Sequence, residues 1–146
     1  HEFIDLPQKP DLSELLVMLN RRVPRYVDED SFVAAIAFEI DFSKRELRYA
    51  AAGINCFLFN AERVTVPGLY LGINAAEVYE LHTLPIAAGD SVCFMTDGIS
   101  DVSDADKSWE RIKADQVCRL FMEQDLDSKA KDDATAICIT VNKVTV

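Results

Sequence analysis

The stretch Gly89–Gly98, GDSVCFMTDG, decides the fold that this sequence predicts. Its centre, SVCFMT at residues 91–96, is an apolar run of strand length. The turn residues Ala88-Gly89-Asp90 precede it, and the corner Asp97-Gly98 ends it. A short apolar run between turn signals is typical of a buried strand. We therefore expect a central strand whose end carries Asp97.

A second acidic corner, Asp132-Asp133, comes directly before the alternating run ATAICITV at residues 134–141. If the two strands are neighbours, Asp97 and Asp132 project from the same edge of a sheet. Two such carboxylates repel each other unless a proton or a cation lies between them. Oxygen ligands favour Mg²⁺ or Mn²⁺ over Zn²⁺, and such an ion can activate water and hold phosphate oxygens. Asp-Gly is also an ordinary turn, so the spacing leaves a purely structural role open.

The rest of the chain predicts an α+β fold built from short strands joined by tight turns. Asp11 with Glu14 has the spacing of a capping box, which predicts a helix that Pro24 ends. A second helical stripe predicts a helix over 108–122, and residues 101–106 are expected to form an acidic loop. Five further strands are expected at residues 32–40, 46–51, 56–60, 63–66 and 78–84.

Composition limits the classes of partner. The chain has 146 residues, of which 49% are hydrophobic, and its 15 Lys+Arg against 25 Asp+Glu give a formal net charge of −10. Nucleic acid and anionic membranes require a basic surface and are therefore excluded, whereas a metal cation or a basic protein patch is compatible. No apolar run approaches the ~20 residues of a membrane helix, and the first ten residues lack the features of a signal peptide. We expect a cytoplasmic protein.

Cysteine and histidine offer little further chemistry at this stage. The four cysteines form no C-x-x-C pair, so a zinc knuckle is disfavoured, and they are expected to be reduced thiols that pack as small hydrophobes. His1 and His82 are the two histidines, and His82 is expected to be structural. The glycines form no nucleotide-binding pattern.

Several stretches, taken in order, resemble one family. LRYAAAG at residues 47–53 is similar to its A-G hairpin, and LYLGI at 69–73 to its G-x-P-L-G-I loop. The stretch at 89–98 resembles its T-D-G strand and corner, and DDAT at 132–135 its D-D-x-T motif. The helix that contains Leu19-Asn20-Arg21 looks like its L-N-R helix. The family is the SpoIIE-type branch of the metal-dependent protein phosphatases (PPM superfamily), and the resemblance runs from about Leu12 to Val141.

This resemblance implies a sandwich of antiparallel β-sheets flanked by α-helices, with two Mn²⁺ or Mg²⁺ ions at the sheet edge. It implies hydrolysis of phosphoserine or phosphothreonine by direct attack of water. Asp97 matches the T-D-G metal aspartate and Asp132 the D-D-x-T metal aspartate, with Asp133 a weaker candidate ligand. The implied partner is a phosphorylated anti-sigma-factor antagonist in bacterial partner switching, and members often serve as output domains of response regulators.

The chain departs from the family pattern in its first half. The Gly-Asp of the first metal motif and the G-D-x-x-G-H-G turn have no counterpart, and Ile54 stands where the hairpin corner has His. Two explanations remain open: residues 11–146 are the C-terminal portion of a family domain after an extended lead-in at 1–10, or the protein is a degenerate relative. The corresponding functions are a phosphatase and a non-catalytic protein-binding module, with an unrelated acidic domain as the third alternative. A sheet without its first strands would expose an edge, so we also expect self-association, such as a homodimer, or additional chain.

Overall fold

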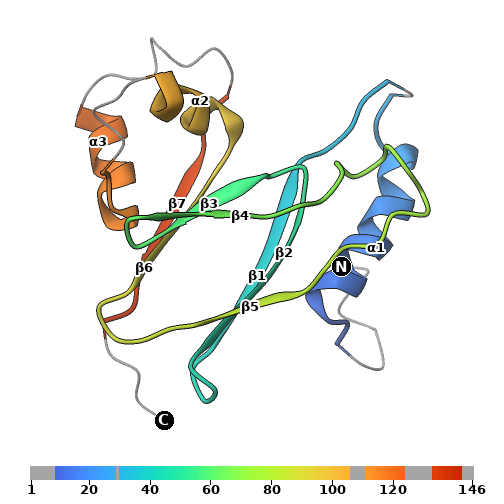
Figure 1. The fold of residues 1–146 in the computed structure, drawn as a ribbon. Coiled ribbons are helices and arrows are strands. Elements are labelled where there is room, and N and C mark those ends of the chain that lie inside the picture. Colours follow the sequence, from blue (N-terminus) through green and yellow to red (C-terminus); the bar gives the residue numbers. More distant parts are fainter. Residues whose placement is uncertain (1–8, 29, 106–110, 124–132, 143–146) are drawn as a thin grey trace. The chain divides into compact units, whose positions relative to one another are not determined.

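The structure is a computed structural model that describes residues 9–28, 30–105, 111–123 and 133–142 (Figure 1). The chain divides into two compact units, which are described separately. The first comprises His1–Asn55 and Pro67–Pro85, and the second Cys56–Val66 and Ile86–Val146. No described helix has the length and apolar character needed to cross a membrane.

The first unit begins with helix α1 (Leu12–Arg22), which starts where the capping box predicted. The Asp11 carboxylate accepts a hydrogen bond from the Glu14 backbone N–H at 2.9 Å, and the Glu14 carboxylate accepts one from the Asp11 N–H at 3.1 Å. A short 3-10 turn, η1 (Val23–Arg25), then ends the helix at the predicted proline. Local sequence alone therefore determines both ends of this helix.

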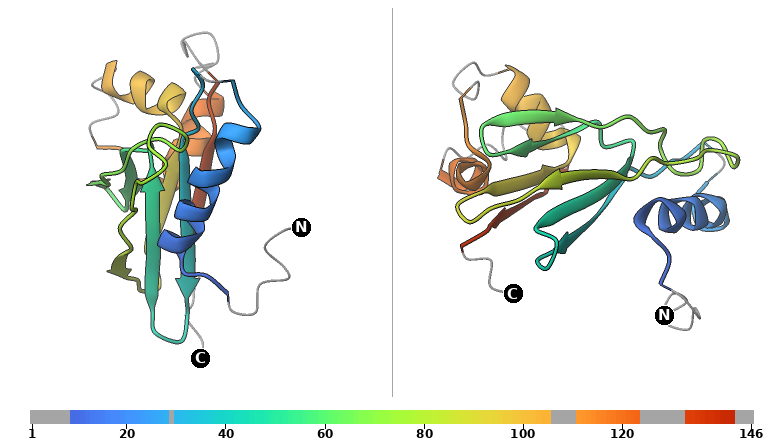
Figure 2. Two further views of the ribbon diagram at one scale, coloured as in Figure 1. Left: turned by 90° about the vertical axis from the view of Figure 1, so that its right-hand side faces the viewer. Right: turned by 60° about the horizontal axis from the view of Figure 1, so that its bottom comes forward.

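Helix α1 packs on a three-stranded antiparallel sheet with the order β1-β2-β5, as Figure 2 shows. Its strands are β1 (Ala35–Asp41), β2 (Glu46–Ala52) and β5 (His82–Pro85). The core of this unit is a cluster of buried side chains from the helix, β2 and the following loop: Leu12, Leu16, Ala50, Ala52, Leu71 and Tyr79. The small alanines of β2 allow the helix to lie close to the sheet.

One buried amide joins helix α1 to the loop that contains the LYLGI motif. Asn20 is fully buried, its Nδ2 donates to the Asn74 carbonyl at 2.7 Å, and its Oδ1 accepts from the Gly72 N–H at 2.8 Å. Gly72 has φ +96°, and an added Cβ would lie 3.2 Å from Val23 Cγ1. The Asn of the L-N-R helix therefore satisfies the polar groups of the loop.

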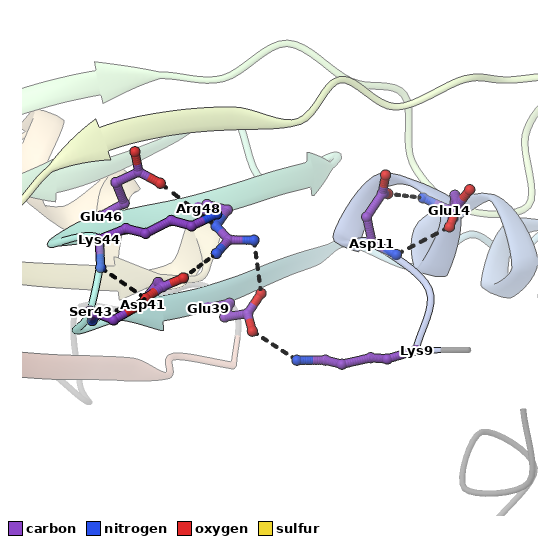
Figure 3. Close-up of polar contacts among 9 residues, drawn as sticks. All are labelled: Lys9, Asp11, Glu14, Glu39, Asp41, Ser43, Lys44, Glu46 and Arg48. Carbon is purple, nitrogen blue, oxygen red and sulfur yellow. Dashed lines mark hydrogen bonds and ion pairs between the residues drawn. The ribbon is translucent and has the colours of Figure 1, made fainter. Parts of the chain in front are cut away.

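The β1–β2 hairpin carries a network of charged side chains around Arg48, drawn in Figure 3. Arg48 forms ion pairs with Asp41 at 2.5 Å and with Glu39 at 3.7 Å, and Lys9 binds Glu39 at 2.8 Å. The Asp41 carboxylate also accepts hydrogen bonds from Ser43, through its N–H and hydroxyl, and from the Lys44 N–H. These bonds, the Ser43 hydroxyl first, lower the pKa of Asp41 from 3.8 to about 2.

The second unit contains a four-stranded antiparallel sheet with the order β4-β3-β6-β7. Its strands are β3 (Cys56–Phe59), β4 (Glu62–Thr65), β6 (Ser91–Met95) and β7 (Ala136–Thr140). Every residue of β6 is buried, as expected for the central apolar strand. Asn60, at the β3–β4 turn, joins the hairpin to the start of β6, because its side chain bonds Asp90 at 3.0 Å and the Ser91 N–H at 2.9 Å.

The helices of the second unit differ from the sequence-based expectation. Residues 101–105, expected to be loop, belong to helix α2 (Asp97–Ala105), which is anchored by the buried Ile99. Instead of a helix over 108–122, the described residues form η3 (Ala114–Gln116) and α3 (Val117–Glu123). The helix starts late because Ala114 N–H donates to the Asn60 carbonyl at 2.7 Å, which fixes the chain before it turns helical.

The α+β class with antiparallel sheets and flanking helices is confirmed. The strand expected over 78–84 is shorter, because β5 begins only at His82 and Val78 is exposed. Self-association and the expected domain boundaries stay predictions.

Replacing Asn20 with Ala should destabilise the chain by about 1–3 kcal/mol, because the Gly72 N–H and Asn74 carbonyl lose their buried partner. Urea denaturation measures this loss. Asn55 is exposed, so Asn55→Ala is the matched control and should change stability by less than about 0.5 kcal/mol. Equal losses in the two variants would contradict the role of the buried amide.

The pKa of Asp41, measured by NMR titration, should be about 2 and should rise toward 3.8 in Ser43→Ala. Lys44→Ala is the control, since Lys44 contributes its backbone N–H and not its side chain. A lowered folded-state pKa stabilises the fold above the unfolded value, and this contribution disappears as the pH falls through the folded value. The stability that Asp41 adds is therefore present above about pH 4 and lost toward about pH 2.

Candidate functional site

Strands β6 and β7 are adjacent and antiparallel, as the two acidic corners predicted. Their register pairs Ser91 with Thr140 at one end and Met95 with Ala136 at the other. The second end is where β6 passes into helix α2 and where the chain enters β7 from the D-D-x-T motif. The T-D-G and D-D-x-T motifs therefore meet at one end of a strand pair.

Thr96 organises this end, because its backbone and side chain serve different elements. Its carbonyl accepts from the Ile99 N–H at 3.0 Å and the Ser100 N–H at 3.2 Å, which are the first bonds of helix α2. Its hydroxyl takes the place of that carbonyl in the sheet and accepts from the Thr135 N–H at 2.9 Å. The Thr96 N–H completes the pair by donating to the Thr135 carbonyl at 3.0 Å.

Asp97, the first residue of helix α2, follows Thr96 directly and is exposed. Its backbone carbonyl accepts from the Ser100 hydroxyl at 3.2 Å, and Gly98 and Ile99 beyond it are buried. The helix thus buries its second and third residues and leaves the Asp97 side chain at the surface. A carboxylate in the first turn is also favoured by the helix dipole.

Asp133 lies at the same end of the strand pair. It is exposed, and its backbone carbonyl lies 3.3 Å from the Thr96 hydroxyl. Asp132 lies outside the described residues, so its expected proximity to Asp97 stays a prediction. The structure places two of the three predicted ligands, Asp97 and Asp133, at the same end of the strand pair.

The carboxylate oxygens of Asp97 and Asp133 are of the type that binds a hard cation. Carboxylate oxygens are the ligands that Mg²⁺ and Mn²⁺ prefer. Among the described residues, three possible metal ligands converge on one point at Cys93, Cys118 and Cys138. Asp97 and Asp133 belong to no such group of three described residues. A full hard-cation site therefore requires Asp132 or further ligands in addition to these two residues.

Other sequence candidates have structural roles. Asp90 of the Gly89-Asp90 pair accepts from the Ala87 N–H at 2.8 Å and from Asn60, which fixes the turn before β6. His82 stacks on Tyr49 at a ring-centroid distance of 5.4 Å within the β2–β5 pair, as a structural histidine would. Gly53, at the A-G corner, has φ +79°, and an added Cβ would lie 2.3 Å from the Tyr70 ring. The backbone of Gly53 in the A-G motif therefore lies against the Tyr70 side chain of the LYLGI motif and leaves no room for a side chain at position 53.

A cavity of about 200 Å³ lies in the first unit beside the Arg48 network, and its wall includes Lys9, Glu39, Arg48 and Leu81. The charged groups of this wall bind one another through the ion pairs of Figure 3. The charged side chains that line this cavity are therefore paired with one another. The acidic end of β6 and β7 is the stronger candidate for a catalytic site.

Comparison with known proteins identifies the family of this chain. The family model described as Stage II sporulation protein E (SpoIIE) matches residues 5–142, which includes both acidic motifs. No curated protein matches the sequence at a significant level.

Solved structures of phosphatase domains share the fold. The RsbU and RsbW domains of a Mycobacterium tuberculosis protein are 21% identical over 94% of this chain and 44% of that one, with a TM-score of 0.67. The Bacillus subtilis SpoIIE phosphatase domain, presoaked with Mn, is 16% identical over 99% of this chain and 71% of that one, with a TM-score of 0.60. RsbX in complex with magnesium is 18% identical over 94% of this chain and 68% of that one, with a TM-score of 0.66. The present chain thus spans less than half of the first structure and about 70% of the other two.

Thr96→Val should remove the hydroxyl that closes the β6–β7 pair at little change in volume. We expect a loss of about 1 kcal/mol in stability and faster hydrogen exchange at the Thr135 N–H. Thr135→Val is the matched control, because the bonds described for Thr135 use its backbone. Unchanged protection of the Thr135 amide in Thr96→Val would show that the hydroxyl does not hold this end together.

Proposed function

This chain belongs to the SpoIIE family of PPM-type phosphatases, and from that premise we propose that it hydrolyses phosphoserine or phosphothreonine on a signalling protein. The observation that carries the proposal is the β6–β7 pair, whose shared end holds Asp97 and Asp133 and leads to Asp132 in the sequence. Both described aspartates are exposed. A substrate the size of a protein can reach them without entering a deep pocket.

In this proposal, Asp97 and Asp132 hold a hard cation, Mn²⁺ or Mg²⁺, with Asp133 in a lesser role. Such an ion, when bound, lowers the pKa of a coordinated water and offsets the charge of phosphate oxygens. The chain's own contribution is positional: Thr96 holds the start of helix α2 against β7, which sets where the Asp97 carboxylate lies. Because two close carboxylates repel, the acidic end is destabilised in the absence of the ion.

The proposed substrate is a phosphorylated protein of the anti-sigma-factor antagonist type, in a cytoplasmic partner-switching pathway. One relative contains RsbU and RsbW domains in the same protein, which supports a regulatory setting for this fold. The net charge of −10 disfavours binding to bare phosphate groups in nucleic acid. The same net charge favours a substrate with basic or neutral side chains around its phosphate.

The second candidate function is a phosphatase-like module that binds a partner without catalysis. The observation that favours it is the absence of the first metal motif, the Gly-Asp pair and the G-D-x-x-G-H-G turn, from these 146 residues. The one Gly-Asp pair is Gly89-Asp90, and Asp90 is used by the turn before β6. If the chain is a phosphatase, Asp97 is needed for turnover. If it is a binding module, Asp97 is dispensable for binding the partner.

Asp97→Asn should lower Mn²⁺-dependent hydrolysis of a phosphoserine protein by at least about 100-fold, because Asn keeps the shape but not the charge that holds a hard cation. Asp133→Asn should lower it less. The measurement is phosphate release at increasing Mn²⁺, together with melting temperatures with and without Mn²⁺. Mn²⁺ should stabilise the parent and not Asp97→Asn.

Asp115→Asn is the matched control, since Asp115 is an exposed aspartate of the same unit, on η3. Its activity and its response to Mn²⁺ should equal those of the parent. Equal turnover in Asp97→Asn and the parent would rule out the catalytic assignment. An inactive parent whose partner binding is unaffected by Asp97→Asn would establish the binding module instead.

A further inference from the structure

Three of the four cysteines meet at one point of the second unit. Cys93 comes from β6, Cys138 from β7 and Cys118 from α3, and their sulfur atoms all lie within 4.8 Å of one another. Up to 45 residues separate them along the chain. Their meeting is therefore a product of the fold, and it lies in the middle of the strand pair rather than at its acidic end.

The register explains why Cys93 and Cys138 are so close. Hydrogen-bonded pairs alternate with non-hydrogen-bonded pairs along an antiparallel ladder. Thr96 bonds Thr135 near one end and Val141 bonds Asp90 at the other, so the Cys93–Cys138 pair falls in a non-hydrogen-bonded position. Side chains are closest in such pairs, and the two sulfur atoms are 3.2 Å apart.

Helix α3 places the third sulfur over this pair. The Cys118 sulfur is 3.8 Å from the Ala136 carbonyl, two residues from Cys138 on β7. Cys93 is fully buried, whereas Cys118 and Cys138 are partly exposed. The cluster is therefore closed on the β6 side and reachable from the side of α3 and β7.

We propose that Cys93, Cys118 and Cys138 form a three-sulfur site for one soft, thiophilic metal ion, and that Cu⁺ fits it best. Three sulfurs arranged around an ion at the usual metal–sulfur distance of ~2.3 Å lie about 4.0 Å apart. The 3.2 Å between Cys93 and Cys138 and the 4.8 Å limit for the group bracket that spacing. Small side-chain rotations would therefore admit the ion without moving the strands.

The surroundings favour Cu⁺ over Zn²⁺. Structural Zn²⁺ sites take four ligands, commonly with His or a fourth Cys. The buried cluster that contains Cys93 otherwise contributes hydrocarbon side chains and the thioether of Met95. Soft sulfur ligands suit Cu⁺ as well as Zn²⁺, and three of them leave Zn²⁺ one ligand short of the four that its structural sites use.

Three sulfurs also distinguish this site from a disulfide pair. A disulfide would use two of the cysteines and leave the third without a role, whereas an ion binds all three. Burial raises the pKa of the Cys93 thiol and raises that of Cys118 to about 11, so these two residues are neutral thiols that pack as hydrophobes. Binding of the ion displaces their protons.

The test is titration of the reduced, full chain with Cu⁺, without oxygen and in competition with a chromogenic Cu⁺ chelator. The parent should bind one equivalent, show sulfur-to-copper absorption in the ultraviolet, and melt at a higher temperature. Cys118→Ala and Cys138→Ala should each weaken binding at least tenfold and abolish the thermal shift. Zn²⁺, titrated in parallel, should bind the parent more weakly than Cu⁺.

Cys56→Ala is the matched control, since Cys56 is a partly buried cysteine of the same unit, on β3, outside the cluster. It should bind Cu⁺ as the parent does, and so should Asp97→Asn, whose change lies at the acidic end. Circular dichroism of each variant checks that it remains folded. Undiminished Cu⁺ affinity in both cluster variants, a loss in Asp97→Asn, or tighter binding of Zn²⁺ would overturn the proposal. Formation of a Cys93–Cys138 disulfide in a chain that binds no Cu⁺ would overturn it as well.

Discussion

Thr96 gives its backbone carbonyl to helix α2 and its hydroxyl to strand β7, and the second unit depends on this division. Because the Thr96 carbonyl bonds to helix α2, it is not available as an acceptor for the Thr135 N–H of the neighbouring strand segment. The hydroxyl restores that bond and fixes the phase of the β6–β7 ladder. This register places the two acidic motifs at one end of the strand pair. It also places Cys93 opposite Cys138 in the middle of the pair.

The two proposed metal sites would use different atoms of one strand pair. The acidic end offers hard oxygen atoms in contact with water, while the middle offers soft sulfur atoms in an apolar environment. Which metal ion binds at each site depends on whether its ligands are hard oxygen atoms or soft sulfur atoms. A hard divalent ion and a soft monovalent ion could accordingly bind to the same pair of strands without competing for the same atoms.

The sequence predicted what local chemistry controls. The capping box of α1 and the central strand β6 follow from patterns within a few residues. The adjacency of β6 and β7 joins segments far apart in the sequence, and its prediction rested on the two acidic corners and the family resemblance. Helix α2 was missed because its residues 101–105 are mostly polar, and its anchor, Ile99, is a single buried contact. The cysteine cluster could not be predicted, because no short spacing marks three residues that only the tertiary fold brings together. For the acidic site, the sequence identified the motifs, while the role of the Thr96 hydroxyl in joining them required the structure.

The buried amide of Asn20 makes the helix less tolerant of substitution than the loop position that it binds through its carbonyl, Asn74. Both of its partners are backbone groups, the Gly72 N–H and the Asn74 carbonyl. The side chain at position 74 can therefore change without removing either bond, whereas position 20 needs a group that donates and accepts at once. A change of side chain at position 74 would leave the helix–loop junction intact, but a change at position 20 would not. Among distant relatives, an Asn at this point of the first helix should therefore outlast most of the loop residues that it binds.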